Sequence, residues 1–143
     1  MFDGLDTAAQ AHFVTPDQLM VWAEWVRPHL AKMTDSSGGR YIGSDLLTAI
    51  AAGRMQLWLG LRGSDLVCVM LTEIQSYPRL RAMRMVGLVG SRPRVWRHLL
   101  AAVETSAKRD FGCAIMECVH IPRFAALLPG YRTTHWFGEK VLG

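Results

Sequence analysis

The hydrophobic residues between positions 19 and 33 recur at helical spacing, which predicts an amphipathic helix. They are Leu19, Trp22, Ala23, Val26, Leu30 and Met33. Residues 15–18 have the composition of a helix start, because Thr15 can act as N-cap, proline suits the first helical position and Gln18 completes a capping box. Pro28 removes a backbone donor inside this helix, so we expect a kink or a break near Arg27.

A shorter apolar stripe, formed by Leu46, Leu47 and Ile50, predicts a second helix after the Ser-Ser-Gly-Gly turn at 36–39. We expect Ser44 to be its N-cap. Gly53 should end it, because glycine readily adopts the left-handed conformation that follows a helix.

From residue 55 the hydrophobic period changes to two, which indicates β-strands. Strands over 55–61 and 66–74 are separated by a short turn, and they are predicted to form a hairpin. The Tyr-Pro turn at 77–78 leads into a third strand over 80–89. We therefore expect a three-stranded antiparallel meander.

A helix and further strands complete the predicted order of elements. The residues at 90–93 end the third strand and open a helix that stops at Gly112. Its buried stripe is Trp96, Leu99, Leu100, Val103 and Ala107. A buried strand over 113–119 should then lie parallel to a neighbour. A short helix over 122–128 and a last strand over 131–142 follow. We expect one α/β domain over residues 1–143, built on a mixed sheet.

Composition supports a globular protein, because half of the 143 residues are apolar and a fifth are charged. The apolar runs are strand-sized, and the N-terminus lacks the features of a signal peptide, so we expect a soluble protein made in the cytoplasm. The three cysteines lie in apolar runs and are expected to be reduced and structural. No metal site is predicted, because the five histidines and the three cysteines do not occur in pairs with the spacing of metal ligands.

The net charge of +4 is unevenly distributed, because no acidic residue occurs between Glu73 and Glu104. Six arginines lie in or near this gap: Arg79, Arg81, Arg84, Arg92, Arg94 and Arg97. The stretch is either a contact surface for phosphate or an acidic partner, or an ordinary solvated basic face. Nucleic-acid binding is not favoured, since an aromatic-interleaved sheet pattern and a recognition helix are both missing.

The order of the elements resembles the GNAT family of acetyl-CoA-dependent N-acetyltransferases over residues 11–142. In the closing segment, a buried strand and a short helix are followed by Gly130-Tyr131, which opens a strand. This arrangement resembles the Gly-aromatic step that the family has at the same place. The chain also resembles small GNAT-like proteins of tailed phages, some of them packaged inside the capsid. The residues of this second resemblance are 53–58, 72–74, 77–80, 128–131 and 139–140. It implies a virion-associated protein made in a bacterial host, with other virion proteins as partners.

In the family, a glycine-containing loop after the meander lets backbone N–H groups reach the cofactor diphosphate. The matching residues here are 90–97, where the glycine positions hold Arg94 or Val95 and Trp96 or Arg97. We expect these bulky side chains to obstruct the cofactor, and Pro93 lacks an N–H. If acetyl-CoA binds, the resemblance assigns it to Val89, Gly90, Ser91, Arg92, Arg94 and Val95.

The family's other catalytic features are also reduced in this chain. The position of the tyrosine that acts as general acid holds Ala126, and Glu73 is the one candidate for the base. A glutamate at a strand end can equally be a solvated residue or a salt-bridge partner. The chain after Gly130 is short for the family's closing hairpin, so an open sheet edge is expected.

Two functions follow from these resemblances. The first is a non-catalytic, virion-associated protein with no cofactor that acts through protein–protein contacts. The alternative is an active acetyl-CoA-dependent N-acetyltransferase with a divergent diphosphate loop.

Overall fold

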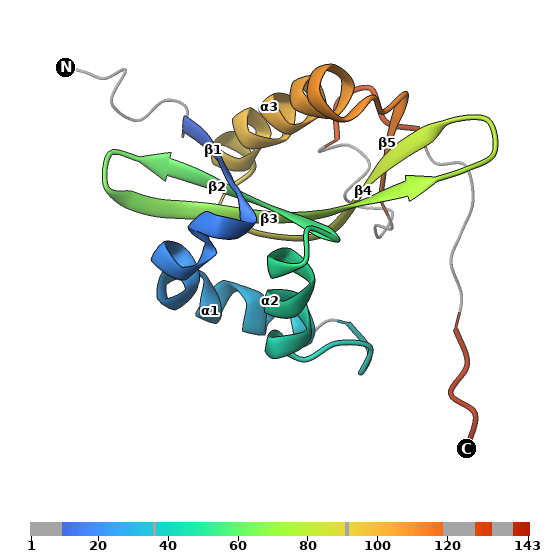
Figure 1. Cartoon of the computed structure of the whole chain (residues 1–143), viewed down its shortest axis with the longest axis horizontal. Helices are drawn as coiled ribbons and strands as arrows, with labels where there is room; N and C mark the ends of the chain where they lie inside the picture. The colour runs from blue at the N-terminus through green and yellow to red at the C-terminus, as the bar shows by residue number, and fades with distance from the viewer. Residues whose placement is uncertain (1–9, 36, 91, 119–127, 133–138) are drawn as a thin grey trace.

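The computed structural model contains one five-stranded sheet in the order β1-β2-β3-β4-β5. It describes residues 10–35, 37–90, 92–118, 128–132 and 139–143. The strands are β1 (Gln10–Val14), β2 (Met55–Arg62), β3 (Asp65–Ser76), β4 (Arg81–Gly90) and β5 (Ile115–Cys118). The helices are η2 (Pro16–Gln18), α1 (Leu19–Asp35), α2 (Gly43–Ala51) and α3 (Pro93–Phe111). Helices α1 and α2 cover one face of the sheet, and α3 covers the other (Figure 1).

The meander of β2, β3 and β4 is antiparallel, as predicted. Strand β2 is buried at every position from Met55 to Gly60, because each face of the sheet carries a helical layer. Leu57 and Leu59 belong to the core beneath α1 and α2, whereas Trp58 belongs to the core beneath α3. Alternation along this strand therefore sorts side chains between two cores, not between core and solvent.

Strand β1 is an element that the sequence pattern did not predict. It is five residues long and pairs antiparallel with β2, with Phe13 opposite Trp58. The rings of these two residues lie 4.7 Å apart, and Phe13 also contacts Phe111 of α3 at 5.8 Å. Because Gln10 and His12 interrupt the short apolar run, only the pairing with β2 identifies the segment as a strand.

Helix α1 continues through Pro28, so it does not break near Arg27. The kink expected as the alternative stays a prediction. Pro28 lies on the exposed side of the helix, where water can hydrate the carbonyl that loses its donor. The helix is preceded by the 3-10 turn η2, in which the Thr15 N–H donates to Gln18 Oε1 at 3.3 Å. This contact forms part of the predicted capping box.

Helix α2 begins two residues earlier than expected, with Ile42 in place of Ser44 as its N-cap. The Ile42 N–H donates to Asp45 Oδ2 at 2.9 Å, so Asp45 satisfies the start of the helix and Ser44 lies within it. The prediction of a Ser44 cap is wrong for this reason. Gly53 follows the helix with a φ of +75°, as predicted.

Helix α3 and β5 form the predicted crossover, and β5 pairs parallel to β4. The apolar stripe of α3 is buried throughout, and Gly112 ends the helix with a φ of +67°. Strand β5 is shorter and less buried than expected, since it spans Ile115–Cys118 and Ile115 is 44% exposed. The helix expected over 122–128 falls almost entirely outside the described residues. Of the strand expected over 131–142, residues 131–132 and 139–142 are not in a strand, and the others are not described.

Within the described residues, no helix is long and apolar enough to cross a membrane. The same part of the chain contains no group of three or more metal-ligating side chains. Cys68 and Cys113 are buried free thiols, and Cys118 is a half-buried one. Burial raises the pKa of the Cys68 thiol to about 11, so it stays protonated at neutral pH.

Candidate functional site

The start of α3 is the first candidate site, because the predicted cofactor loop lies there. Arg92 is the N-cap in an extended conformation, and its carbonyl accepts the N–H of Val95 at 3.0 Å and of Trp96 at 3.2 Å. The first amides of a helix usually remain available to an anion. Here Pro93 has no N–H, and the N–H of Val95 already has an acceptor.

Two bulky residues of this turn point into the core. Val95 and Trp96 are 5% and 7% exposed and pack among the buried residues beneath α3. Gly90 lies close to this core, since a Cβ there would stand 2.9 Å from Cys68 Cβ and 3.5 Å from Trp96 Cδ1. Of the four residues expected to obstruct the cofactor, Val95 and Trp96 turn their side chains into the core, whereas Arg94 and Arg97 are exposed. Obstruction by the two arginines stays a prediction.

The exposed side chains of this turn are Arg92, Arg94 and Arg97. Val89, the first residue of the predicted cofactor set, is half-buried and packs toward α1 and α2. Ser91 lies outside the described residues. The turn therefore presents arginine charge to solvent, while two of its first amide positions cannot donate.

The six arginines of the basic stretch do not form the single surface that the sequence suggested. Arg81 Nη1 donates to the carbonyl of Phe111 at 2.9 Å, and Arg84 forms an ion pair with Glu117 at 3.0 Å. Strand β4 spans about 30 Å and separates Arg79 and Arg81 from the three arginines of the α3 turn. Arg81 and Arg84 therefore make contacts within the protein.

Glu73, the candidate base, lies on β3 and on the face opposite α3, as the alternation with Met70 and Ile74 requires. Its Oε1 accepts a hydrogen bond from Gln75 Nε2 at 2.9 Å. Its cross-strand neighbour is Arg84, whose guanidinium reaches Glu117 on β5. Glu73 therefore belongs to a row of polar side chains across the sheet.

Tyr77 extends this polar row at the end of β3. Its hydroxyl donates to Glu117 Oε1 at 2.8 Å, and Arg84 Nη2 donates to the same hydroxyl at 3.3 Å. The Glu117 hydrogen bond raises the pKa of Tyr77. The three side chains satisfy one another, which suits a structural network at the sheet surface.

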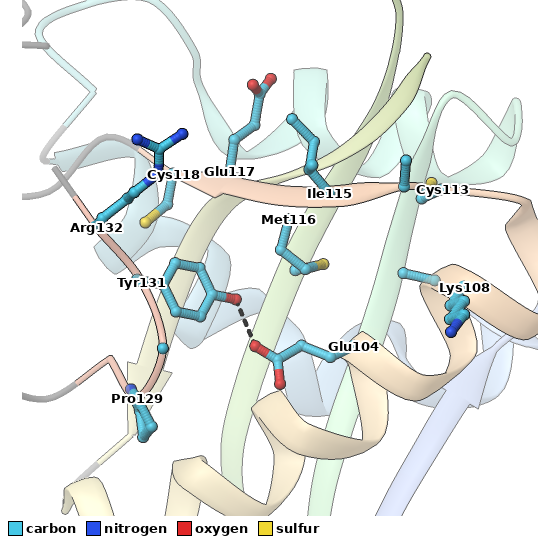
Figure 2. A pocket seen from close by; sticks show the side chains of 13 residues that line it. Glu104, Lys108, Cys113, Ile115, Met116, Glu117, Cys118, Pro129, Tyr131 and Arg132 are labelled. Carbon is cyan, nitrogen blue, oxygen red and sulfur yellow. Dashed lines mark hydrogen bonds between the residues drawn. The ribbon is translucent and has the colours of Figure 1, made fainter. Parts of the chain in front are cut away.

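A cavity of about 530 Å³ lies between α3, β5 and residues 129–132 (Figure 2). Glu104 and Tyr131 point toward each other in it, and the Tyr131 hydroxyl donates to Glu104 Oε2 at 2.7 Å. Met116 and Cys118 of β5 also line the cavity, with Lys108 at its α3 side. Sequence reasoning did not select Glu104 or Tyr131 as site residues, although the Gly130-Tyr131 step marked the tyrosine.

Burial and the Glu104 carboxylate together raise the pKa of Tyr131. The phenol therefore remains protonated, and its hydroxyl donates its hydrogen bond to Glu104. This hydrogen bond connects residue 131 to α3. A general acid would instead direct its proton toward a substrate.

No family model matches this chain, and no curated protein matches it. Solved structures do. One titled a probable acetyltransferase has 14% identity and a TM-score of 0.70, with 94% of this chain and 97% of that chain covered. A ribosomal-protein-alanine N-acetyltransferase from Brucella melitensis biovar Abortus 2308 has 10% identity and a TM-score of 0.67, with 94% and 98% covered. A GNAT family acetyltransferase from Staphylococcus aureus subsp. aureus USA300_TCH1516 has 16% identity and a TM-score of 0.64, with 93% and 98% covered.

This chain has the GNAT fold. The predicted mixed α/β architecture is thereby confirmed. At identities below a fifth the likeness concerns the fold, so a function must be argued from this chain's own residues. The family resemblance would seat acetyl-CoA at the start of α3, where Pro93 has no N–H and the Val95 N–H is bonded to the Arg92 carbonyl.

Proposed function

We propose that this chain is a non-catalytic GNAT-fold protein that acts through contacts with other proteins. The observation that carries the proposal is the first turn of α3, where Pro93 has no N–H and the Val95 N–H is bonded to the Arg92 carbonyl. A diphosphate bound there would lose two of the short backbone contacts that hold it in place. The arginine side chains supply charge, but they do not supply fixed donors at backbone distance.

The polar residues elsewhere support the same proposal. The Glu73 carboxylate accepts a hydrogen bond from Gln75, and the tyrosine position of the family holds Ala126. The Tyr131 hydroxyl donates a hydrogen bond to Glu104. None of these groups is set up as a free acid or base. The resemblance to small tailed-phage proteins supplies the class of partner, which is other virion proteins in a structural, internal or morphogenetic role.

The second candidate is an active acetyl-CoA-dependent N-acetyltransferase. It is favoured by the solved structures of the same fold, several of which are named acetyltransferases and match over 94% of this chain. In this reading Arg92 and Arg94 would hold the diphosphate by charge, since arginine binds phosphate well.

Isothermal titration with acetyl-CoA separates the two candidates. We expect no binding up to about 1 mM acetyl-CoA. A GNAT enzyme with a glycine-containing loop serves as the positive control. A micromolar Kd, about 8 kcal/mol of binding free energy, would overturn the non-catalytic proposal. If binding occurs, the variant R92E/R94E tests whether the two exposed arginines hold the diphosphate, with R79E as the matched control from the far end of β4.

The virion role needs its own test. Mass spectrometry of purified particles from a phage that encodes this chain should detect it at a constant ratio to the major capsid protein. Loss of the chain during purification of intact particles would refute the virion assignment, whatever the result of the titration.

A further inference from the structure

The outer face of α1 carries large apolar side chains in solvent. Met20 is 86% exposed, Val21 is 73% exposed and Trp25 is 53% exposed. Val21, Trp25 and the exposed Pro28 follow one another at helical spacing, so they form a continuous stripe. We call these three residues, together with Met20 beside them, the α1 stripe. Exposed apolar groups gathered in this way mark contact surfaces more often than scattered single residues do.

Trp25 is held in position by its neighbours. Its ring meets Trp22 edge-on, with centroids 6.0 Å apart, and Trp22 in turn lies 5.6 Å from His12 of β1. Trp22 is half-buried against the core beneath α1 and α2. A tryptophan held by such a chain loses little freedom on binding, as expected of an interface anchor.

The charges beside the α1 stripe are arranged so that the helix complements itself. Asp17 and Glu24 lie toward its N-terminal half, and Arg27 and Lys32 lie toward its C-terminal half, with Asp35 as the last residue. Glu24 and Arg27 form an exposed ion pair at 3.1 Å. In an antiparallel pair of two such helices, the acidic half of each meets the basic half of the other, and the helix dipoles also oppose.

We propose that the α1 stripe is the interface of a homodimer in which two copies of α1 pack antiparallel about a two-fold axis near Trp25. A second copy is favoured over an acidic or basic partner because the stripe is apolar and its flanking charges balance within one helix pair. A 17-residue helix is about 25 Å long. It offers less than the roughly 800 Å² per partner of a standard interface, so the dimer is reversible. The inference does not depend on whether acetyl-CoA binds.

Sedimentation velocity of the full chain between about 10 µM and 1 mM tests the dimer. We expect a concentration-dependent shift to twice the monomer mass. The variant W25E should raise the dimer Kd by about thirtyfold or more, which is the loss typical of an interface hot spot. The control L80E changes another exposed apolar residue, in the turn after β3, and should leave the Kd unchanged. Circular dichroism verifies that both variants fold.

Charge reversal tests the two-fold arrangement. E24K should weaken the dimer, and E24K/R27E should restore it, because each reversed residue then meets its reversed partner. A monomer at all concentrations would overturn the proposal, as would a dimer unaffected by W25E. Equal affinities for E24K and the double variant would exclude the antiparallel pairing.

Discussion

At the scale of single residues, a buried series of side-chain hydrogen bonds connects β2 and β3. Trp58 Nε1 donates to Thr72 Oγ1 at 2.9 Å, and the Thr72 hydroxyl donates to Gln56 Oε1 at 2.9 Å. All three side chains are buried, and Thr72 is 0% exposed. Because one hydroxyl serves as acceptor and donor, Thr72 satisfies two other polar groups that could not reach water.

The substitution Thr72→Val should destabilise the protein by about 1–3 kcal/mol, since it leaves the Trp58 N–H without its acceptor. Urea unfolding measures the change. Thr105→Val is the matched control, because the Thr105 hydroxyl is exposed and bonds only within α3. It should change stability by less than about 0.5 kcal/mol. Equal effects of the two variants would contradict the role given to Thr72.

At the scale of elements, the close approach of β4 to β3 beside α3 depends on a glycine. Gly90 ends β4 opposite Cys68 of β3, and the Trp96 ring lies above the same point. The sequence marked Gly90 as a strand breaker. The structure shows that glycine is needed at position 90 for steric reasons. A side chain there would collide with the Cβ of Cys68, which cannot move away as the end of a flexible side chain could.

Gly90→Ala should therefore cost about 1–3 kcal/mol, the usual cost of overpacking a core. Gly43→Ala is the control, since no atom lies within 4 Å of a Cβ at Gly43 and the residue lies in α2. There alanine should be neutral or slightly stabilising. Thermal and urea unfolding of both variants would decide the matter, and a stable G90A protein would show that the turn can shift.

At the scale of the whole molecule, the contact between Tyr131 and Glu104 joins residues 128–132 to α3 (Figure 2). Tyr131 has a raised pKa in the fold and an ordinary value near 10 when unfolded. A raised value means that the stabilisation is complete below about pH 10 and is lost as the pH rises above it, because the unfolded chain then releases the proton more easily.

Tyr131→Phe should accordingly be less stable than the unmodified chain at pH 7, and the difference should narrow at pH 11. Urea unfolding at the two pH values measures it. Tyr77→Phe is a comparison variant, not a control without the effect: Tyr77 is exposed, but its carboxylate partner also raises its pKa, so the difference should narrow in the same direction. A difference that stays constant from pH 7 to pH 11 would mean that the Tyr131 hydroxyl does not stay protonated in the fold.

The sequence alone determined the elements that are local in origin. The buried apolar faces of α1 and α3, the stops at Gly53 and Gly112 and the alternation of the meander depend on neighbours a few residues apart, so the sequence predicts them. The wrong cap at Ser44 and the missing break at Pro28 also have local causes. Asp45 accepts the N–H of the actual N-cap, Ile42, and Pro28 lies on the solvated side of α1.

Tertiary structure decided what depends on distant partners. Strand β1 exists because β2 pairs with it, and Glu104 and Tyr131 meet across 27 residues of sequence. The six arginines lie in one stretch of the sequence, but β4 separates Arg79 and Arg81 from the three arginines of the α3 turn. Val95 and Trp96 could be counted in the cofactor loop from the sequence, yet only the packing of α3 on the sheet turned them inward. Local periodicity records which face of an element is apolar, whereas the partner of that face is chosen by the whole fold.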